Sequence, residues 1–104
     1  MNYDQKKVLV VGMARSGVAA AQLLRASGAV VTVNDSKPES ELGDQLKPLD
    51  GLKLERHFGC GAMDLLEGQD CLVISPGIPD SAPFVRKARE MGIYVIGELE
   101  LASQ

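Results

Sequence analysis

The stretch from residue 8 to residue 33 constrains the fold most. An apolar run at 8–11 leads into Gly12-Met-Ala-Arg-Ser-Gly17, and an alanine- and leucine-rich stretch at 18–26 precedes a second apolar run at 29–33. Continuous β-branched runs are typical of strands buried on both faces of a parallel sheet, whereas Ala and Leu favour helix. The stretch therefore predicts a β-α-β unit, and strand twist predicts a right-handed crossover.

The rest of the chain continues this alternation. Apolar runs predict further strands at 70–75 and 93–96, and an alternation of apolar and charged residues predicts a short edge strand at 52–55. A helix is expected at 82–91, with shorter helical pieces within 39–49 and 59–68 and from residue 98 onward. The 104 residues suffice for one compact domain and are too few for two. We therefore expect an α/β fold over 1–104: a Rossmann-like, doubly wound, mainly parallel five-stranded sheet with helices on both faces.

Charge and composition exclude several classes. The net charge of −3 and the scattered Lys and Arg residues argue against binding to nucleic acid. The apolar runs are too short to cross a bilayer, and the polar first residues do not resemble a signal peptide, so a cytoplasmic location is expected. Cys60 and Cys71 are expected as free thiols. No residues have the spacing of a metal cluster or of a nucleophile–base pair, so neither a metal site nor a catalytic residue is predicted.

The turn from the first strand into the first helix is the strongest candidate for a phosphate site. Gly12 allows a sharp turn, Gly17 allows helix and strand to approach, and the helix N-terminus offers unpaired N–H groups with a partial positive charge. Arg15 adds a cation, and Ser16 is suited either to cap the helix or to donate to a phosphate oxygen. Ala14 stands where the dinucleotide fingerprint has its second glycine, so the motif is degraded. The alternative is a structural turn without a ligand.

Two further loops are expected at the same edge of the sheet. Asp35 ends the second strand at the place where dinucleotide folds put an acid that binds a ribose, and Ser36 and Lys37 follow it. The alternative role for Asp35 is a turn residue that caps nearby N–H groups. The third loop, Ser75-Pro-Gly-Ile-Pro79, is held rigid by two prolines, which makes it either a wall for a ligand or a stiff connector.

Four other residues are not expected to act at the site. His57 is expected on a surface turn, and Glu98 and Glu100 on the solvated face of the last helix. Met13 is expected to pack inside the protein, with contact to a ligand as the alternative.

Four blocks together carry a family resemblance: Gly12-Met-Ala-Arg-Ser-Gly-Val-Ala-Ala-Ala21, Val33-Asn-Asp-Ser-Lys-Pro38, Ser75-Pro-Gly-Ile-Pro79 and Gly97-Glu-Leu-Glu-Leu-Ala102. In this order they resemble the N-terminal domain of the Mur ligases that add D-glutamate in bacterial peptidoglycan synthesis. The resemblance covers essentially the whole chain. It implies a domain that holds the UDP part of UDP-N-acetylmuramoyl-L-alanine within a three-domain, ATP-dependent ligase, of which this sequence would be a fragment.

The resemblance also implies roles for individual residues. Asp35 and Ser36 would contact the edge of the uracil ring, with Lys37 close by. The diphosphate would be bound by the segment 12–17, which includes Gly12, Ala14, Arg15, Ser16 and Gly17. The loop formed by Ser75, Pro76 and Gly77 would pass close to the nucleotide-sugar. ATP and magnesium would bind to the central domain of the full-length enzyme, so the resemblance implies no cofactor for this domain and no ligation by it alone. The alternatives are an NAD-binding domain of an oxidoreductase, against which Ala14 counts, and a ligand-free interaction domain that keeps the fold.

Overall fold

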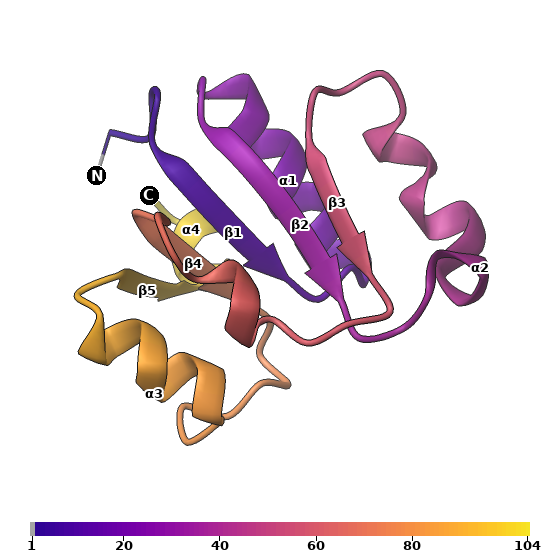
Figure 1. Cartoon of the computed structure of the whole chain (residues 1–104). Coiled ribbons are helices and arrows are strands. Elements are labelled where there is room, and N and C mark those ends of the chain that lie inside the picture. The colour runs from indigo at the N-terminus through magenta and orange to yellow at the C-terminus, as the bar shows by residue number, and fades with distance from the viewer. Residues whose placement is uncertain (1) are drawn as a thin grey trace.

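A computed structural model describes residues 2–104, which form a five-stranded sheet with helices on both faces (Figure 1). The strands are β1 (Lys7–Val11), β2 (Val30–Asp35), β3 (Glu55–Phe58), β4 (Cys71–Ile74) and β5 (Tyr94–Gly97). They lie in the order β3-β2-β1-β4-β5, and every neighbouring pair is parallel. The predicted fold class is confirmed.

The α-helices are α1 (Arg15–Ala26), α2 (Glu39–Leu42), α3 (Pro83–Glu90) and α4 (Glu98–Ala102). Two 3-10 helices, η1 (Gly43–Leu49) and η2 (Met63–Leu65), occupy the connections on either side of β3. Among the described residues, none of these helices combines the length and hydrophobicity that crossing a bilayer requires.

The central strand β1 divides the core into two layers. Its side chains alternate, so that Val8 and Val10 pack with Leu24 of α1 and with residues of α4 and η1. Leu9 and Val11 point the other way and pack with Val85 of α3. All four of these β1 residues are buried, as the uninterrupted apolar run predicts.

The edge strand lies further along the chain than the sequence pattern indicates. The alternation at 52–55 predicts a strand there, but pairing with β2 begins only at Glu55 and runs to Phe58. The reason is that the Leu52 amide still closes a turn onto the Leu49 carbonyl, while Leu52 and Leu54 pack against the core without ladder bonds. His57 therefore lies on this edge strand, and its predicted position on a surface turn is wrong.

Candidate functional site

Three loops leave the carboxyl ends of neighbouring strands and meet at one edge of the sheet. The loop after β1 lies in the middle: the Gly12 amide donates to the Asn34 carbonyl at the end of β2, at 2.8 Å. On the other side, a Cβ placed on Gly12 would lie 3.4 Å from the Ser75 hydroxyl oxygen, which follows β4. The strand order β2-β1-β4 produces this arrangement, and in open α/β sheets ligands bind outside such carboxyl ends.

Two glycines shape the segment 12–17, which we call the phosphate loop. Gly12 has a φ of +98°, a conformation that side chains disfavour, and it turns the chain out of β1. Gly17 is buried in the first turn of α1, where a Cβ would overlap the Gly12 carbonyl oxygen and lie 2.9 Å from its carbon. Both roles predicted for these glycines are confirmed.

The phosphate loop presents free hydrogen-bond donors. Within residues 2–104, the amides of Ala14, Arg15, Ser16 and Gly17 have no acceptor, and the first hydrogen bond of α1 runs from Val18 to the Ala14 carbonyl. The N-cap of α1 is Ala14, whose methyl side chain cannot accept hydrogen bonds from these amides. Ser16 is the second residue of the helix, so it does not cap α1. Ala14, Arg15 and Ser16 are exposed, whereas Gly17 is buried, so the donors of the first three residues lie where an anion can reach them.

Met13, the residue that follows Gly12, is held by hydrogen bonds at both its amide and its carbonyl. Met13 is fully buried, as expected, and its amide donates to Asp35 Oδ2 at 2.7 Å. Its carbonyl accepts a hydrogen bond of 2.6 Å from Gln45 Nε2, a side chain of η1. These two contacts fix the backbone from which the free amides of the phosphate loop project.

Asp35 has the contacts of its alternative role, a turn residue that caps nearby N–H groups. Its Oδ1 accepts from the Lys37 amide at 2.9 Å, which is a local turn contact, while Oδ2 takes the Met13 amide. Each carboxylate oxygen has two acceptor positions, so one remains on each oxygen. Asp35 is half-buried, and Ser36 and Lys37 beside it are exposed.

Hollows flank the phosphate loop on both sides. One, of about 560 Å³, lies between α1 and η1 and is lined by Arg15, Lys37 and Gln45 among others. Another, of about 290 Å³, is lined by Ser75, Pro76 and Glu98 among others. In the part of the chain that the structure describes, neither Arg15 nor Lys37 forms an ion pair, and both line the first of these hollows.

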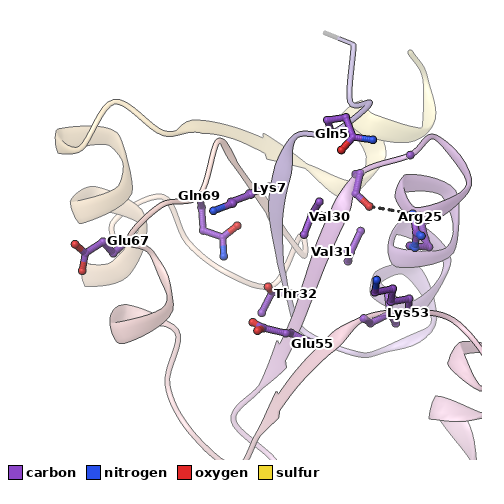
Figure 2. Close-up of a pocket in the computed structure, with 13 residues that line it drawn as sticks. Gln5, Lys7, Arg25, Val30, Val31, Thr32, Lys53, Glu55, Glu67 and Gln69 are labelled. Atoms are coloured by element: carbon purple, nitrogen blue, oxygen red, sulfur yellow. Dashed lines mark hydrogen bonds between the residues drawn. The ribbon is translucent and has the colours of Figure 1, made fainter.

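A larger hollow of about 660 Å³ lies at the opposite, amino end of the strands (Figure 2). Its lining includes Lys7 and Arg25, but Arg25 is bonded to the Ala29 carbonyl at 3.3 Å. Its lining includes Gly28, in the turn at the C-terminus of α1, and a helix C-terminus carries a partial negative charge. We therefore place the candidate site at the carboxyl end of the strands, despite the smaller volumes there.

The described residues contain no group of three His, Cys, Asp or Glu side chains that could hold a metal ion. Cys60 is exposed, Cys71 is buried and both are free, which confirms the expectation for the thiols. Burial raises the pKa of the Cys71 thiol to about 12, with a smaller contribution from the nearby charge of Asp70.

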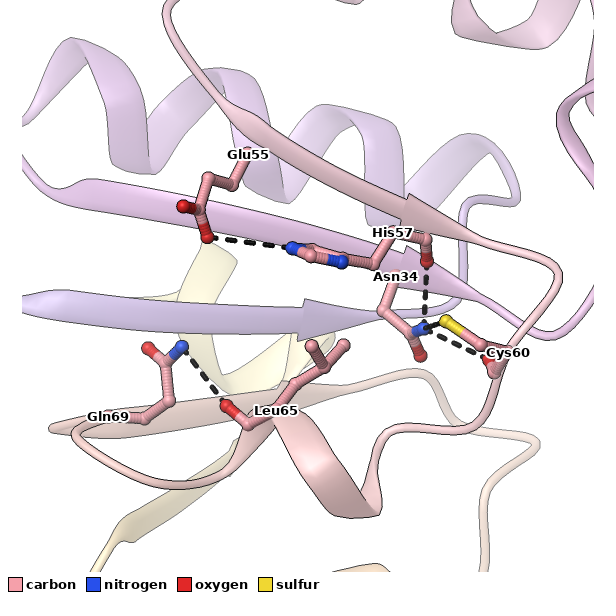
Figure 3. Close-up of polar contacts among 6 residues, drawn as sticks. All are labelled: Asn34, Glu55, His57, Cys60, Leu65 and Gln69. Carbon is pink, nitrogen blue, oxygen red and sulfur yellow. Dashed lines mark hydrogen bonds and ion pairs between the residues drawn. The ribbon is translucent and has the colours of Figure 1, made fainter.

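Sequence reasoning missed three residues that support the site. The first is Asn34, whose amide nitrogen donates to the carbonyls of His57 and Cys60 and so ties the loop after β3 to β2 (Figure 3). A polar residue inside an apolar strand was a usable signal for Asn34. Gln45 gave no signal, because its contact with Met13 depends on how η1 packs against α1.

The third missed residue is Glu98. It is 4% exposed, so its predicted place on a solvated face is wrong, whereas Glu100 is exposed as expected. The burial follows from its position: Glu98 begins α4 directly after the carboxyl end of β5, and this turn faces α1.

Sequence comparison finds relatives over nearly the whole chain. A family model described as "Mur ligase MurD-like, N-terminal domain" matches residues 6–97. The chain is 50% identical to a UDP-N-acetylmuramoylalanine–D-glutamate ligase of Exiguobacterium sibiricum over 99 residues, which are 95% of this chain and 22% of that protein. It is 49% identical over 98 residues to the ligase of the same name from Enterococcus hirae, with 93% of this chain and 21% of the relative covered. The chain thus spans about a fifth of the length of these relatives.

Solved structures show the same fold at lower identity. A pseudomurein peptide ligase type C from Methanothermus fervidus superposes with a TM-score of 0.74 at 21% identity, covering 95% of this chain and 20% of that one. A shikimate dehydrogenase from Aquifex aeolicus superposes with a TM-score of 0.62 at 14% identity, covering 97% and 45%. Because both a ligase and a dehydrogenase share the architecture, the fold does not decide between their functions.

Proposed function

Because the chain belongs to the family of MurD-like N-terminal domains of Mur ligases, we propose that it holds the UDP portion of UDP-N-acetylmuramoyl-L-alanine for an ATP-dependent ligase that adds D-glutamate. The relatives that share about half of its residues carry the name of that ligase. The ligation itself, its substrates and the further domains are part of this proposal.

The observation that carries the proposal is the set of free amides at the start of α1. Four consecutive N–H groups without protein acceptors, next to the uncompensated Arg15, favour a ligand with several anionic oxygens. A diphosphate has this chemistry. Ala14 supports the choice of ligand, because its methyl group hinders the close backbone approach that a dinucleotide pyrophosphate makes at this position.

The neighbouring loops suit the remaining parts of a nucleotide-sugar. Asp35 retains acceptor positions that fit the N3–H of uracil, with Ser36 and Lys37 beside it as donors. Ser75 and Pro76 line the other flank, where the sugar would lie, and Gly77 follows them in the same loop. The domain's contribution is therefore to bind and orient the substrate, with no covalent step at its own side chains.

ATP and magnesium do not fit the residues present. The sequence contains no GxxxxGK[ST] loop, and residues 2–104 offer no cluster of metal ligands. We propose that both bind to another part of the full-length ligase, and that this chain by itself neither hydrolyses ATP nor forms the amide bond.

Calorimetric titration with UDP, uridine and NADH tests the proposal. We expect UDP to bind in about the millimolar range or tighter and to bind more tightly than uridine, because only UDP reaches the phosphate loop. NADH provides the control for the oxidoreductase alternative and is followed by its fluorescence. Tight NADH binding with enhanced fluorescence, or no heat from UDP, would contradict the assignment.

A further inference from the structure

The buried carboxylate of Glu98 has no partner within the described part of the chain. Both of its side-chain oxygens are shielded from solvent, and neither accepts a hydrogen bond. It takes part in none of the ion pairs: the nearby Arg89 pairs with Asp80 at 3.3 Å. A buried, unpaired carboxylate is costly, so its retention calls for a physical explanation.

The position of Glu98 supplies that explanation. Its Oε1 lies 3.1 Å from the place where a Cβ on Gly17 would stand. Gly17 belongs to the first turn of α1, a helix of twelve residues whose leading amides are free. The carboxylate thus faces the positive end of the helix from inside the protein, whereas a ligand would approach the same end from the crevice.

We propose that Glu98 is an internal counter-charge of α1 that lowers the affinity of the phosphate loop for a diphosphate. The inference rests on the proposed function, because it names what tunes the same site. The carboxylate and the diphosphate compete for one helix N-terminus, and two anions separated by protein interior repel each other with little screening by salt. In this scheme the buried carboxylate oxygens of Glu98 make no contact with the diphosphate; Glu98 acts through α1 and favours release of the diphosphate.

Glu98→Gln tests the proposal, since the amide keeps the size of the side chain and removes the charge. Glu100→Gln is the matched control: it removes the same charge from the same helix at an exposed position, where water screens it. The ligands are UDP, uridine and inorganic pyrophosphate, and their affinities are measured by the shifts of backbone amide signals in NMR spectra.

We expect Glu98→Gln to bind UDP and pyrophosphate about tenfold more tightly than the wild-type chain, which corresponds to about 1.4 kcal/mol. Affinity for uridine should stay the same, and Glu100→Gln should change the pyrophosphate affinity less than about twofold. If Glu98→Gln does not fold, Glu98→Met removes the charge without a polar atom and carries the same expectation.

Three outcomes would overturn the proposal: unchanged pyrophosphate affinity, weaker pyrophosphate affinity, or an equal gain for uridine, which would indicate a general rearrangement of the loops. The test also separates this inference from the proposed function. If the wild-type chain and Glu98→Gln both ignore UDP while Glu98→Gln gains affinity for pyrophosphate, the UDP assignment fails and the role of Glu98 stands.

Discussion

Replacing Gly17 with Ala should destabilise the fold and remove the phosphate site together. The added Cβ would overlap the Gly12 carbonyl oxygen and lie 2.9 Å from the Gly12 carbonyl carbon, closer than the 3.0 Å below which real Cβ atoms essentially never approach another atom. Both of these atoms are backbone, so no side chain can rotate away. The start of α1 must then move off the end of β1.

The magnitude follows from two opposing effects. Overpacking of this kind costs about 3 kcal/mol. Replacing glycine by alanine inside a helix raises the free energy of unfolding by about 1 kcal/mol, because alanine has the higher helix propensity. We therefore expect the free energy of unfolding to fall by about 2 kcal/mol, and binding of UDP to weaken because the free amides of α1 shift relative to Asp35.

Urea unfolding measures the stability change, which should lower the midpoint by about 1–2 M. Gly61→Ala is the control, because a Cβ there meets no atom within 4 Å and the residue does not require positive φ; its stability should stay within about 0.5 kcal/mol of wild type. If Gly17→Ala were as stable as Gly61→Ala and bound UDP normally, the close approach of helix and strand would not be what forms the site.

Three further predictions concern Asp35 and the two cysteines. Asp35→Ala should weaken binding of uridine nucleotides by about 1–3 kcal/mol and also lower the free energy of unfolding, because the Met13 and Lys37 amides lose their acceptor. Calorimetry measures the change in affinity, and urea unfolding measures the change in stability. Unchanged affinity for uridine would refute the role of Asp35 in binding. At pH 8 a thiol reagent should modify exposed Cys60 readily and Cys71 only on unfolding. Since folding raises the pKa of Cys71 from 9.0 to about 12, its contribution to stability is present below pH 9 and is lost as the pH rises toward 12. Burial also raises the pKa of Tyr3, so a Cys71→Ala variant should lose less stability than the wild-type chain over this range rather than none. An equal loss in both proteins would contradict the assignment.

The sequence predicted the parts of the fold that depend on local pattern. The apolar run of β1, the alanine-rich α1 and the glycines at 12 and 17 are each specified by neighbours along the chain, and the structure confirms them. The convergence of three loops also followed, because parallel strands bring their carboxyl ends to one edge.

The failures occur where distant packing decides the outcome. The alternation of Leu52 and Leu54 looked like a strand, yet pairing with β2 starts at Glu55 because a preceding turn still holds Leu52. Glu98 looked solvated because a terminal helix normally exposes its acids, but this helix packs its first residue against α1. No local pattern reports such a contact.

The most direct test of the central claim is an NMR titration of the chain with UDP, read amide by amide. If the loops after β1, β2 and β4 form one nucleotide site, the largest shifts will fall on residues 12–17, on Asp35, and on Ser75 and Gly77, while the amides around Lys7 and Arg25, in the opposite hollow, stay unchanged. Shifts confined to that opposite hollow, or none at millimolar UDP, would contradict the account.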